Sequence, residues 1–148
     1  MSWTVEFYEE DEGRAPAREF LLSLSFAKRA AAIAAIEAVL VPMGLDVCKS
    51  EYGRPLGNGL YEFRLRHDEK TILLKAGGHA DDASTGDVLL RFFFAAYGQR
   101  IILLLGGYDK GRDSSPRRQS KEIERARRAL RSFNLRLERQ KAAARRRQ

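Results

Sequence analysis

Apolar residues recur along the chain with two different spacings, and each spacing predicts a type of secondary structure. Residues 3–8, 88–97 and 100–108 are rich in aromatic and branched side chains, which favours strands. Residues 60–66 alternate between apolar and charged positions, which predicts a strand with one core face and one charged face. The turn at 98–99 is so short that the strands on either side of it should pair antiparallel.

Three other segments show the 3.6-residue period of an amphipathic helix. The first begins at Pro16, and the second follows Ser25, a good N-cap residue, and runs to about Val41. We expect these two to form a hairpin that covers one side of the sheet. The third covers about residues 117–140, with one apolar face and arginines elsewhere, and residues 141–148 are expected to fray.

The order of these elements is a strand, two helices, several antiparallel strands and a last helix, which predicts an α+β fold. A length of 148 residues fits one domain, placed here at residues 1–140 with a basic tail at 141–148. Residues 53–59 and 77–87 are expected to be loops because they are rich in glycine and polar residues. Residues 70–76 either continue the preceding strand or form a neighbouring one.

The formal net charge of +7 is distributed unevenly. Residues 112–148 hold 14 Lys or Arg against 4 Asp or Glu, whereas residues 1–111 hold 13 against 16. All of the excess positive charge therefore lies in the last quarter, where it can attract polyanions without reading their sequence. The alternative is a solvated helix with a disordered end.

Composition also bears on the compartment and on cofactors. No apolar run approaches the roughly 20 residues that span a bilayer, and the N-terminus lacks a basic segment followed by an apolar one. The single cysteine, Cys48, excludes an internal disulfide, and we expect it to fill space rather than act as a nucleophile. These features predict a cytoplasmic protein. Because metal-ligand spacings and a glycine-rich phosphate loop are missing from the sequence, we expect no cofactor and no metal.

The run IILLLGGYDK at residues 101–110 predicts a buried strand that carries polar groups at its end. Tyr108 would stack on a base or donate to a phosphate, with a core position as its alternative. Lys110 would stabilise charge or donate a proton. Asp109 is the nearest candidate base, or it only caps the turn. A strand that simply ends in a solvated turn is the other interpretation of the whole run.

Two arginines stand out on the predicted strands. Arg64 lies on the charged face and has a planar guanidinium that suits paired phosphate oxygens. Its alternative is an ordinary pair with Glu62 or Asp68. Arg91 stands alone inside the apolar run LLRFFF, so a buried guanidinium there needs a carboxylate or a substrate phosphate. A structural pair with Glu62 is the alternative for Arg91.

Further substrate contacts are expected from Arg66, Arg112 and His67. The imidazole of His67 has an intrinsic pKa that suits proton transfer. A surface role is the alternative for His67, as it is for His79 in the polar loop.

Four segments of the chain together resemble one known family. They are LYEFRLR (60–66), LLRFFF (89–94), LLLGGYDKG (103–111) and RRQSKEIERARRAL (117–130). In this order they are similar to the phage-derived Gp49-like branch of the RelE/HigB toxins, the toxin half of type II toxin–antitoxin pairs. The resemblance covers about residues 3–135. It implies a RelE-like fold, in which an N-terminal strand and a helical hairpin pack on a mainly antiparallel sheet.

The resemblance also implies an activity and partners. The expected function is an endoribonuclease that cleaves mRNA, often in the ribosomal A site, and that a small helix-turn-helix antitoxin neutralises. Without a metal, such an enzyme uses the substrate's 2′-hydroxyl as nucleophile and cations to stabilise the phosphorane. Two other functions stay open: a non-catalytic protein on the same fold, such as a gyrase inhibitor, and a nucleic-acid-binding accessory protein that acts through its basic tail.

The chain departs from the family's compact pattern in two places. Roughly residues 67–87 are inserted between the strands that carry Arg64 and Arg91, which leaves the register of these two arginines open. The basic C-terminal helix is also longer than in the smallest members, and it either adds affinity for RNA or the ribosome or is merely solvated.

Overall fold

A computed structural model of the chain describes residues 2–68 and 87–147, with the backbone alone at 67, 68 and 87. The strands and α-helices follow one another as β1 (Thr4–Phe7), α1 (Pro16–Ser23), α2 (Phe26–Ala35), α3 (Val41–Met43), β2 (Gly53–Gly57), β3 (Leu60–Asp68), β4 (Asp87–Tyr97), β5 (Ile101–Asp109) and α5 (Pro116–Arg146). A π-helical turn η1 (Ile36–Leu40) and a 3₁₀-helix η2 (Gly44–Lys49) flank α3.

The five strands form one mixed sheet in the order β1-β5-β4-β3-β2. β1 runs parallel to β5, and the other neighbours are antiparallel, including β4 and β5 on either side of the short turn. The α+β class is therefore confirmed. The expectation of a loop at 53–59 is wrong in part, because Gly53–Gly57 forms the edge strand β2, where Pro55 is tolerated. The expectations for residues 70–76 and for the loop that follows them fall outside the described residues.

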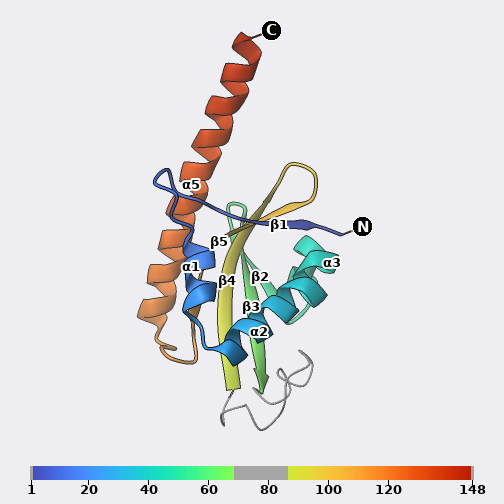
Figure 1. The fold of residues 1–148 in the computed structure, drawn as a ribbon, viewed down its shortest axis with the longest axis vertical. Helices are drawn as coiled ribbons and strands as arrows, with labels where there is room; N and C mark the ends of the chain where they lie inside the picture. The colour runs from blue at the N-terminus through green and yellow to red at the C-terminus, as the bar shows by residue number, and fades with distance from the viewer. Residues whose placement is uncertain (1, 69–86, 148) are drawn as a thin grey trace.

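Helices cover both faces of the sheet (Figure 1). The hairpin of α1 and α2, which the sequence predicts, packs on one face around Phe63, Phe92 and Leu104. The long helix α5 packs on the other face, where Ala126 and Leu130 meet a second cluster of buried side chains. The face of β3 that the sequence marks as charged is therefore partly covered by a helix rather than open to water.

Each helix of the hairpin begins at the residue that the pattern identifies. Pro16 occupies the first turn of α1, and the Ser25 hydroxyl accepts a hydrogen bond from the backbone N–H of Lys28 at 3.4 Å, which caps α2. Gly44 ends α3 with a positive φ of 54°, and η2 follows directly. A Cβ there would lie 2.1 Å from the Trp3 ring, so only glycine lets β1 approach this turn.

The stretch Phe26–Lys49 is long and apolar enough to span a membrane by length and composition alone. This finding corrects the expectation that no apolar run approaches that length. In the structure Ala31, Ala32 and Leu40 of this stretch are buried in the core cluster that covers the sheet. The core helix of a globular domain meets the same criterion, so the stretch is weak support for a membrane segment.

Helix α5 starts where the sequence predicts and ends later. The Ser115 hydroxyl accepts a hydrogen bond from the Arg118 N–H at 3.2 Å and caps the first turn. The helix then continues to Arg146, so residues 141–146, which were expected to fray, are helical. Arg145 and Arg146 in the last turn interact favourably with the negative end of the helix dipole, which supports this extension.

Candidate functional site

The register of three neighbouring strands places Arg64, Arg91 and Tyr108 in one row across the sheet. Arg64 on β3 pairs with Arg91 on β4, and Arg91 pairs with Tyr108 on β5. Directly paired residues point to the same face of a sheet. The long segment between β3 and β4 therefore does not shift the two arginines out of register.

A bulge in β5 decides which of the strand's last residues join this row. Phe94 pairs with Leu104 and Phe93 with Gly106, so Leu105 is an extra residue in β5. Because side chains alternate between faces, one extra residue exchanges the faces of everything that follows. Tyr108 is thereby brought to the face of Arg91, and Asp109 is turned to the opposite face.

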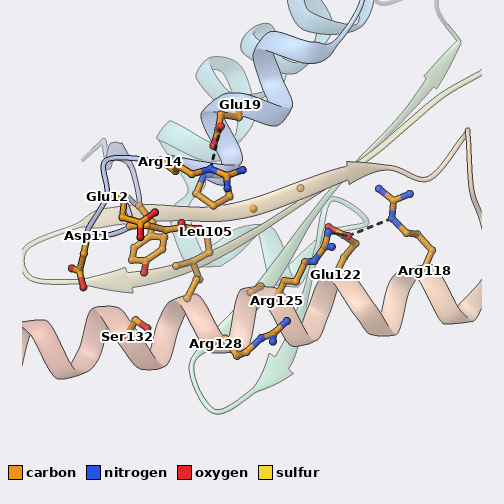
Figure 2. Close-up of a pocket in the computed structure, with 17 residues that line it drawn as sticks. Asp11, Glu12, Arg14, Glu19, Leu105, Arg118, Glu122, Arg125, Arg128 and Ser132 are labelled. Atoms are coloured by element: carbon orange, nitrogen blue, oxygen red, sulfur yellow. Dashed lines mark hydrogen bonds and ion pairs between the residues drawn. The ribbon is translucent and has the colours of Figure 1, made fainter.

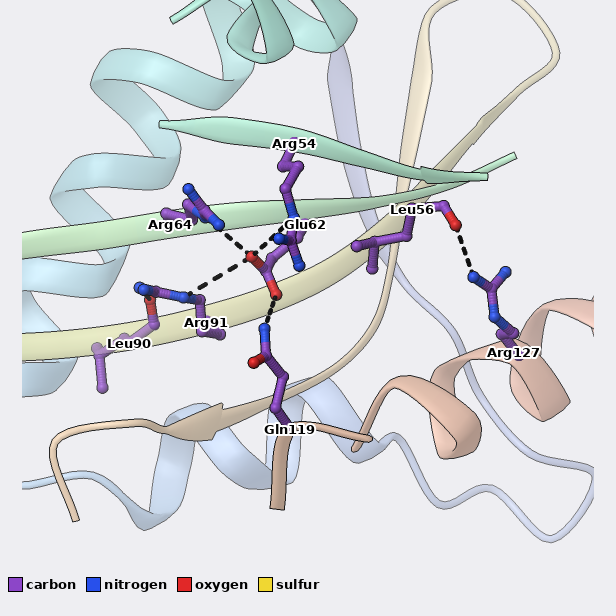
Figure 3. Close-up of polar contacts among 8 residues, drawn as sticks. All are labelled: Arg54, Leu56, Glu62, Arg64, Leu90, Arg91, Gln119 and Arg127. Atoms are coloured by element: carbon purple, nitrogen blue, oxygen red, sulfur yellow. Dashed lines mark hydrogen bonds and ion pairs between the residues drawn. The ribbon is translucent and has the colours of Figure 1, made fainter. Parts of the chain in front are cut away.

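The buried carboxylate of Glu62 lies at the centre of the row's polar contacts (Figure 3). Arg64 donates a hydrogen bond from Nε to Glu62 Oε1 at 2.9 Å. The Nε atoms of Arg91 and Arg54 lie 3.8 Å and 3.9 Å from the same oxygen. Gln119 of α5 donates to the other oxygen at 3.5 Å. A fully buried carboxylate requires such partners, since an unpaired charge in this position would be very costly.

More positive charge gathers here than one carboxylate neutralises. Lys110 directly follows β5, two residues after Tyr108. Burial, and after it the Arg91 guanidinium, lowers the pKa of Lys110. Burial likewise lowers the pKa of Arg91, while Glu62 opposes that shift. The side chains of Arg64 and Arg54 are 33% and 45% exposed, so both guanidinia reach solvent. We call Arg54, Arg64, Arg91 and Lys110 with Glu62 the cation cluster.

Tyr108 shares the face of the cation cluster but is a core residue. It is 1% exposed, and its ring stacks on Phe93 with the ring centroids 6.2 Å apart. The Arg118 guanidinium lies 5.5 Å from the ring centroid. Burial raises the pKa of the Tyr108 phenol, and its hydroxyl has no hydrogen-bond partner among the described residues. The structure thus favours the core position for Tyr108 over stacking on a substrate base.

Asp109 does not belong to the cation cluster. Lys28 of α2 donates to Asp109 Oδ2 at 2.6 Å, and the N–H of Gly111 donates to Oδ1 at 3.0 Å. The carboxylate therefore joins α2 to the sheet and caps the turn after β5, on the face opposite Arg91. This placement favours the alternative in which Asp109 caps the turn over a role as the base for the phosphate chemistry.

Arg66 and Arg112, the other arginines expected to contact substrate, lie in two different places. Arg66 is exposed and shares the face of Arg64, so it borders the cation cluster. Arg112 is also exposed but lines a small cavity of about 320 Å³ together with Asp109. The backbone of His67 pairs with Val88, and its side chain is outside the described part of the chain, as is all of His79. The role of His67 stays a prediction.

Sequence reasoning missed several residues of this site. Glu62 appeared only as a possible partner, although the alternation of β3 already put it on the face of Arg64. Arg54 lies in GRPLGNG, where glycine and proline hide the strand pattern. Gln119 meets Glu62 only because α5 packs over this face, and no local sequence pattern indicates that packing.

A larger cavity of about 760 Å³ lies between α5, the bulge of β5 and the segment before α1 (Figure 2). Its walls mix acidic side chains, such as Glu10 and Glu12, with arginines of α5. The buried carboxylate of Glu122 is held there by Arg118 and Arg125, at 3.4 Å and 2.8 Å. Arg54, Arg64 and Arg91 do not line this cavity, so it is separate from the cation cluster.

The described part of the chain offers neither a candidate metal site nor an activated cysteine. Within residues 2–68 and 87–147, no three side chains of His, Cys, Asp or Glu come together as a candidate metal site. Cys48 is half-buried against the core, and burial raises the pKa of its thiol, which lowers the fraction of reactive thiolate.

Comparison with known proteins adds no family assignment. No protein-family model matches this chain, and no curated protein matches its sequence. The resemblance to the RelE/HigB toxins therefore rests on the four segments named above.

Proposed function

We propose that this chain is a RelE-like toxin that cleaves mRNA at the cation cluster. One observation carries the proposal: three arginines from three adjacent strands converge on Glu62, and Lys110 follows at the end of the next strand, β5. Four cations against one carboxylate leave an excess of positive charge, which suits a backbone phosphate. The order of a strand, a helical hairpin, antiparallel strands and a helix supports a RelE-like fold.

The proposed substrate position is above the exposed guanidinia. Arg54 and Arg64 reach solvent, and they can form paired hydrogen bonds with two oxygens of one phosphate. Arg91 lies below them and is almost completely buried, so it acts on the phosphate by charge at short range. Glu62 is too buried to touch substrate, and its role is to position the three guanidinium groups.

In the proposed reaction, the substrate's 2′-oxygen attacks the adjacent phosphorus and the bond from phosphorus to the 5′-oxygen breaks. The products are a 2′,3′-cyclic phosphate and a 5′-hydroxyl. The proton of the 2′-hydroxyl passes to water, and the Lys110 ammonium donates a proton to the departing 5′-oxygen. The guanidinium groups stabilise the extra negative charge of the phosphorane, which is commonly the largest contribution to such reactions.

The rest of the proposal follows from the resemblance. The substrate would be mRNA, free or on the ribosome, and a small helix-turn-helix antitoxin would neutralise the toxin. Both partners imply that the protein acts in the cytoplasm.

One observation favours a non-catalytic protein on the same fold, for example a gyrase inhibitor. Asp109 is held by Lys28 on the opposite face, and the Tyr108 hydroxyl is buried. Among the described residues, no carboxylate or phenol near the cation cluster is then free to act as a base. In this alternative the cluster binds an anion without cleaving it.

The deciding experiment is cleavage of a defined RNA by the purified protein in the presence of EDTA. We expect a 2′,3′-cyclic phosphate product, and we expect a single 2′-deoxy substitution at the cleaved nucleotide to abolish it. Arg64→Ala should lower the rate by about 10²-fold or more, the loss typical of removing one charge-stabilising group. The control is Arg18→Ala, which removes an exposed arginine on α1.

Two outcomes would reject the proposal. One is a protein that binds RNA but leaves it intact both alone and when the RNA is translated by ribosomes. The other is an Arg64→Ala variant that cleaves as fast as the Arg18→Ala control. Growth arrest on induced expression with intact mRNA and damaged DNA would instead support the gyrase-inhibitor alternative.

A further inference from the structure

The last three turns of α5 form an arm, residues 137–147, which projects beyond the sheet and the other helices (Figure 1). Leu130 is the last buried residue of α5. Among the described residues, Arg136 is the last whose side chain hydrogen-bonds to the rest of the domain, at the Glu9 carbonyl (3.0 Å) and the Asp11 carboxylate (2.9 Å). Among the described residues, no side-chain hydrogen bond or ion pair joins the arm to the domain.

The arm is basic on all sides. It holds five Lys or Arg against the single Glu138. Arg139 and Arg146 lie on one side of the helix, and Lys141 and Arg145 lie on another, because successive residues are 100° apart. The last-turn arginines interact favourably with the helix dipole, but Arg139 and Lys141 lie too far from the end to gain from it.

The composition of the arm narrows the choice of partner. Leu137 is the only large apolar residue of the arm, and its other apolar residues are three alanines. A helix that docks into a protein groove or lies on a membrane needs a continuous apolar face, which is missing here. A dense positive charge without an apolar face is instead typical of binding to nucleic-acid phosphates, where released counterions supply the affinity.

We infer that the arm is a second RNA-binding site, which holds the backbone of a folded RNA at a distance from the phosphate that is cleaved. The inference rests on the proposed function in that it takes RNA as the ligand. Gln119 of α5 touches the cation cluster, and Arg139 lies 20 residues further along the helix. A helix of that length spans about 30 Å, so only an extended or folded RNA reaches both sites.

Two variants with the same change of net charge test this inference. The arm variant is Arg139→Gln, Arg145→Gln and Arg146→Gln together, and glutamine keeps the helix propensity high. The control variant is Arg14→Gln, Arg18→Gln and Lys49→Gln, at three exposed positions of the domain. The probe is an RNA hairpin with a duplex of about one helical turn or more, and affinity is measured over a range of salt concentrations.

For the arm variant, we expect the slope of log affinity against log salt to fall in magnitude by about 2 to 3, since each phosphate contact contributes about 0.7 to 0.9. The control should change this slope by less than about 1. In cleavage assays the arm variant should raise the KM for the hairpin, leave kcat unchanged, and leave cleavage of a short single strand unaffected.

Two results would overturn the inference: equal salt slopes for the two triple variants, or an arm variant that loses binding to phosphatidylserine vesicles but not to RNA. The binding and cleavage measurements distinguish a failure of this inference from a failure of the proposed function. If the arm variant loses affinity for the hairpin but the wild-type protein cleaves no RNA, the arm is an RNA-binding site and the proposed nuclease activity is wrong. If the wild-type protein cleaves RNA and the arm variant binds the hairpin as tightly as wild type, the nuclease proposal holds and the inference about the arm is wrong.

Discussion

Arg64 and Arg91 lie directly opposite each other in the antiparallel pairing of β3 and β4. Like charges in this position repel and normally destabilise a sheet. Here Glu62 Oε1 accepts a hydrogen bond from Arg64 and lies 3.8 Å from Arg91. The carboxylate therefore compensates for a pairing that would otherwise be unfavourable.

Glu62→Gln should consequently destabilise the protein. The amide has nearly the same shape but no charge, so Arg91 would be left buried without a counterion. Breaking a buried ion pair commonly costs about 3 to 5 kcal/mol, and we expect the lower end because Arg54 and Arg64 can turn to solvent. Urea unfolding gives the free energy.

The matched control is Glu37→Gln, at an exposed position of η1, which should change the unfolding free energy by less than about 0.5 kcal/mol. If Glu62→Gln were as stable as this control, Glu62 would not be the counterion that the site requires.

The sequence predicted much of the sheet that carries this pair. Alternation in β3, the short turn between β4 and β5, and the capping serine before α2 depend on near neighbours in the chain, so they are readable locally. The face of Arg64 followed from the same alternation.

The features that could not be predicted from the sequence depend on residues far away in the chain or on the insertion of a single residue. β2 is a strand because β3 pairs with it, although its own residues favour a turn. The extra residue Leu105 leaves no mark in the apolar run, yet it decides that Tyr108 rather than Asp109 faces Arg91. The burial of Glu62 results from α5 crossing its face, which no local pattern encodes.

Asp109→Asn tests the face exchange that the bulge produces. Because Asp109 binds Lys28 at 2.6 Å away from the cation cluster, we expect cleavage of RNA within about threefold of wild type and a loss of stability. A hydrogen bond to a charged group contributes about 1.5 to 3 kcal/mol, which sets the expected loss in urea unfolding. Lys28→Met should destabilise to a similar extent.

The opposite result would show that Asp109 is a catalytic base. In that case Asp109→Asn would lower the cleavage rate by about 10²-fold or more, as removal of a general base does, and Lys28→Met would leave the rate unchanged.

Tyr108→Phe and Tyr97→Phe should have opposite effects on stability. The buried Tyr108 hydroxyl has no partner among the described residues, so its removal relieves a desolvation cost and should leave the protein as stable or up to about 1 kcal/mol more stable. The Tyr97 hydroxyl donates to Glu6 at 2.5 Å, and its removal should cost about 1 kcal/mol. A large loss of stability in Tyr108→Phe would show that the hydroxyl has a partner.

The same Tyr97 hydrogen bond predicts a pH dependence. The bond to Glu6 raises the pKa of Tyr97 to about 12, above the ordinary value of 10.0. A raised pKa in the folded state means that the stabilisation is complete below pH 10 and is lost as the pH rises towards 12. Absorbance of the phenolate should show a component with a midpoint near 12 that disappears in Tyr97→Phe; its persistence in that variant would exclude this assignment.

The pH profile of cleavage should identify Lys110 as the proton donor. Burial and the neighbouring arginines lower the pKa of Lys110 from its ordinary value of 10.5. An acid must be protonated to act, so kcat should fall as the pH rises through this lowered pKa, before an unperturbed lysine would titrate. Lys110→Ala should lower kcat by about 10² to 10⁴ with natural RNA, and much less with a substrate whose leaving group needs no proton. The control is Lys49→Ala, at an exposed position. If Lys110→Ala lowers kcat equally with both substrates, Lys110 stabilises charge and does not donate the proton.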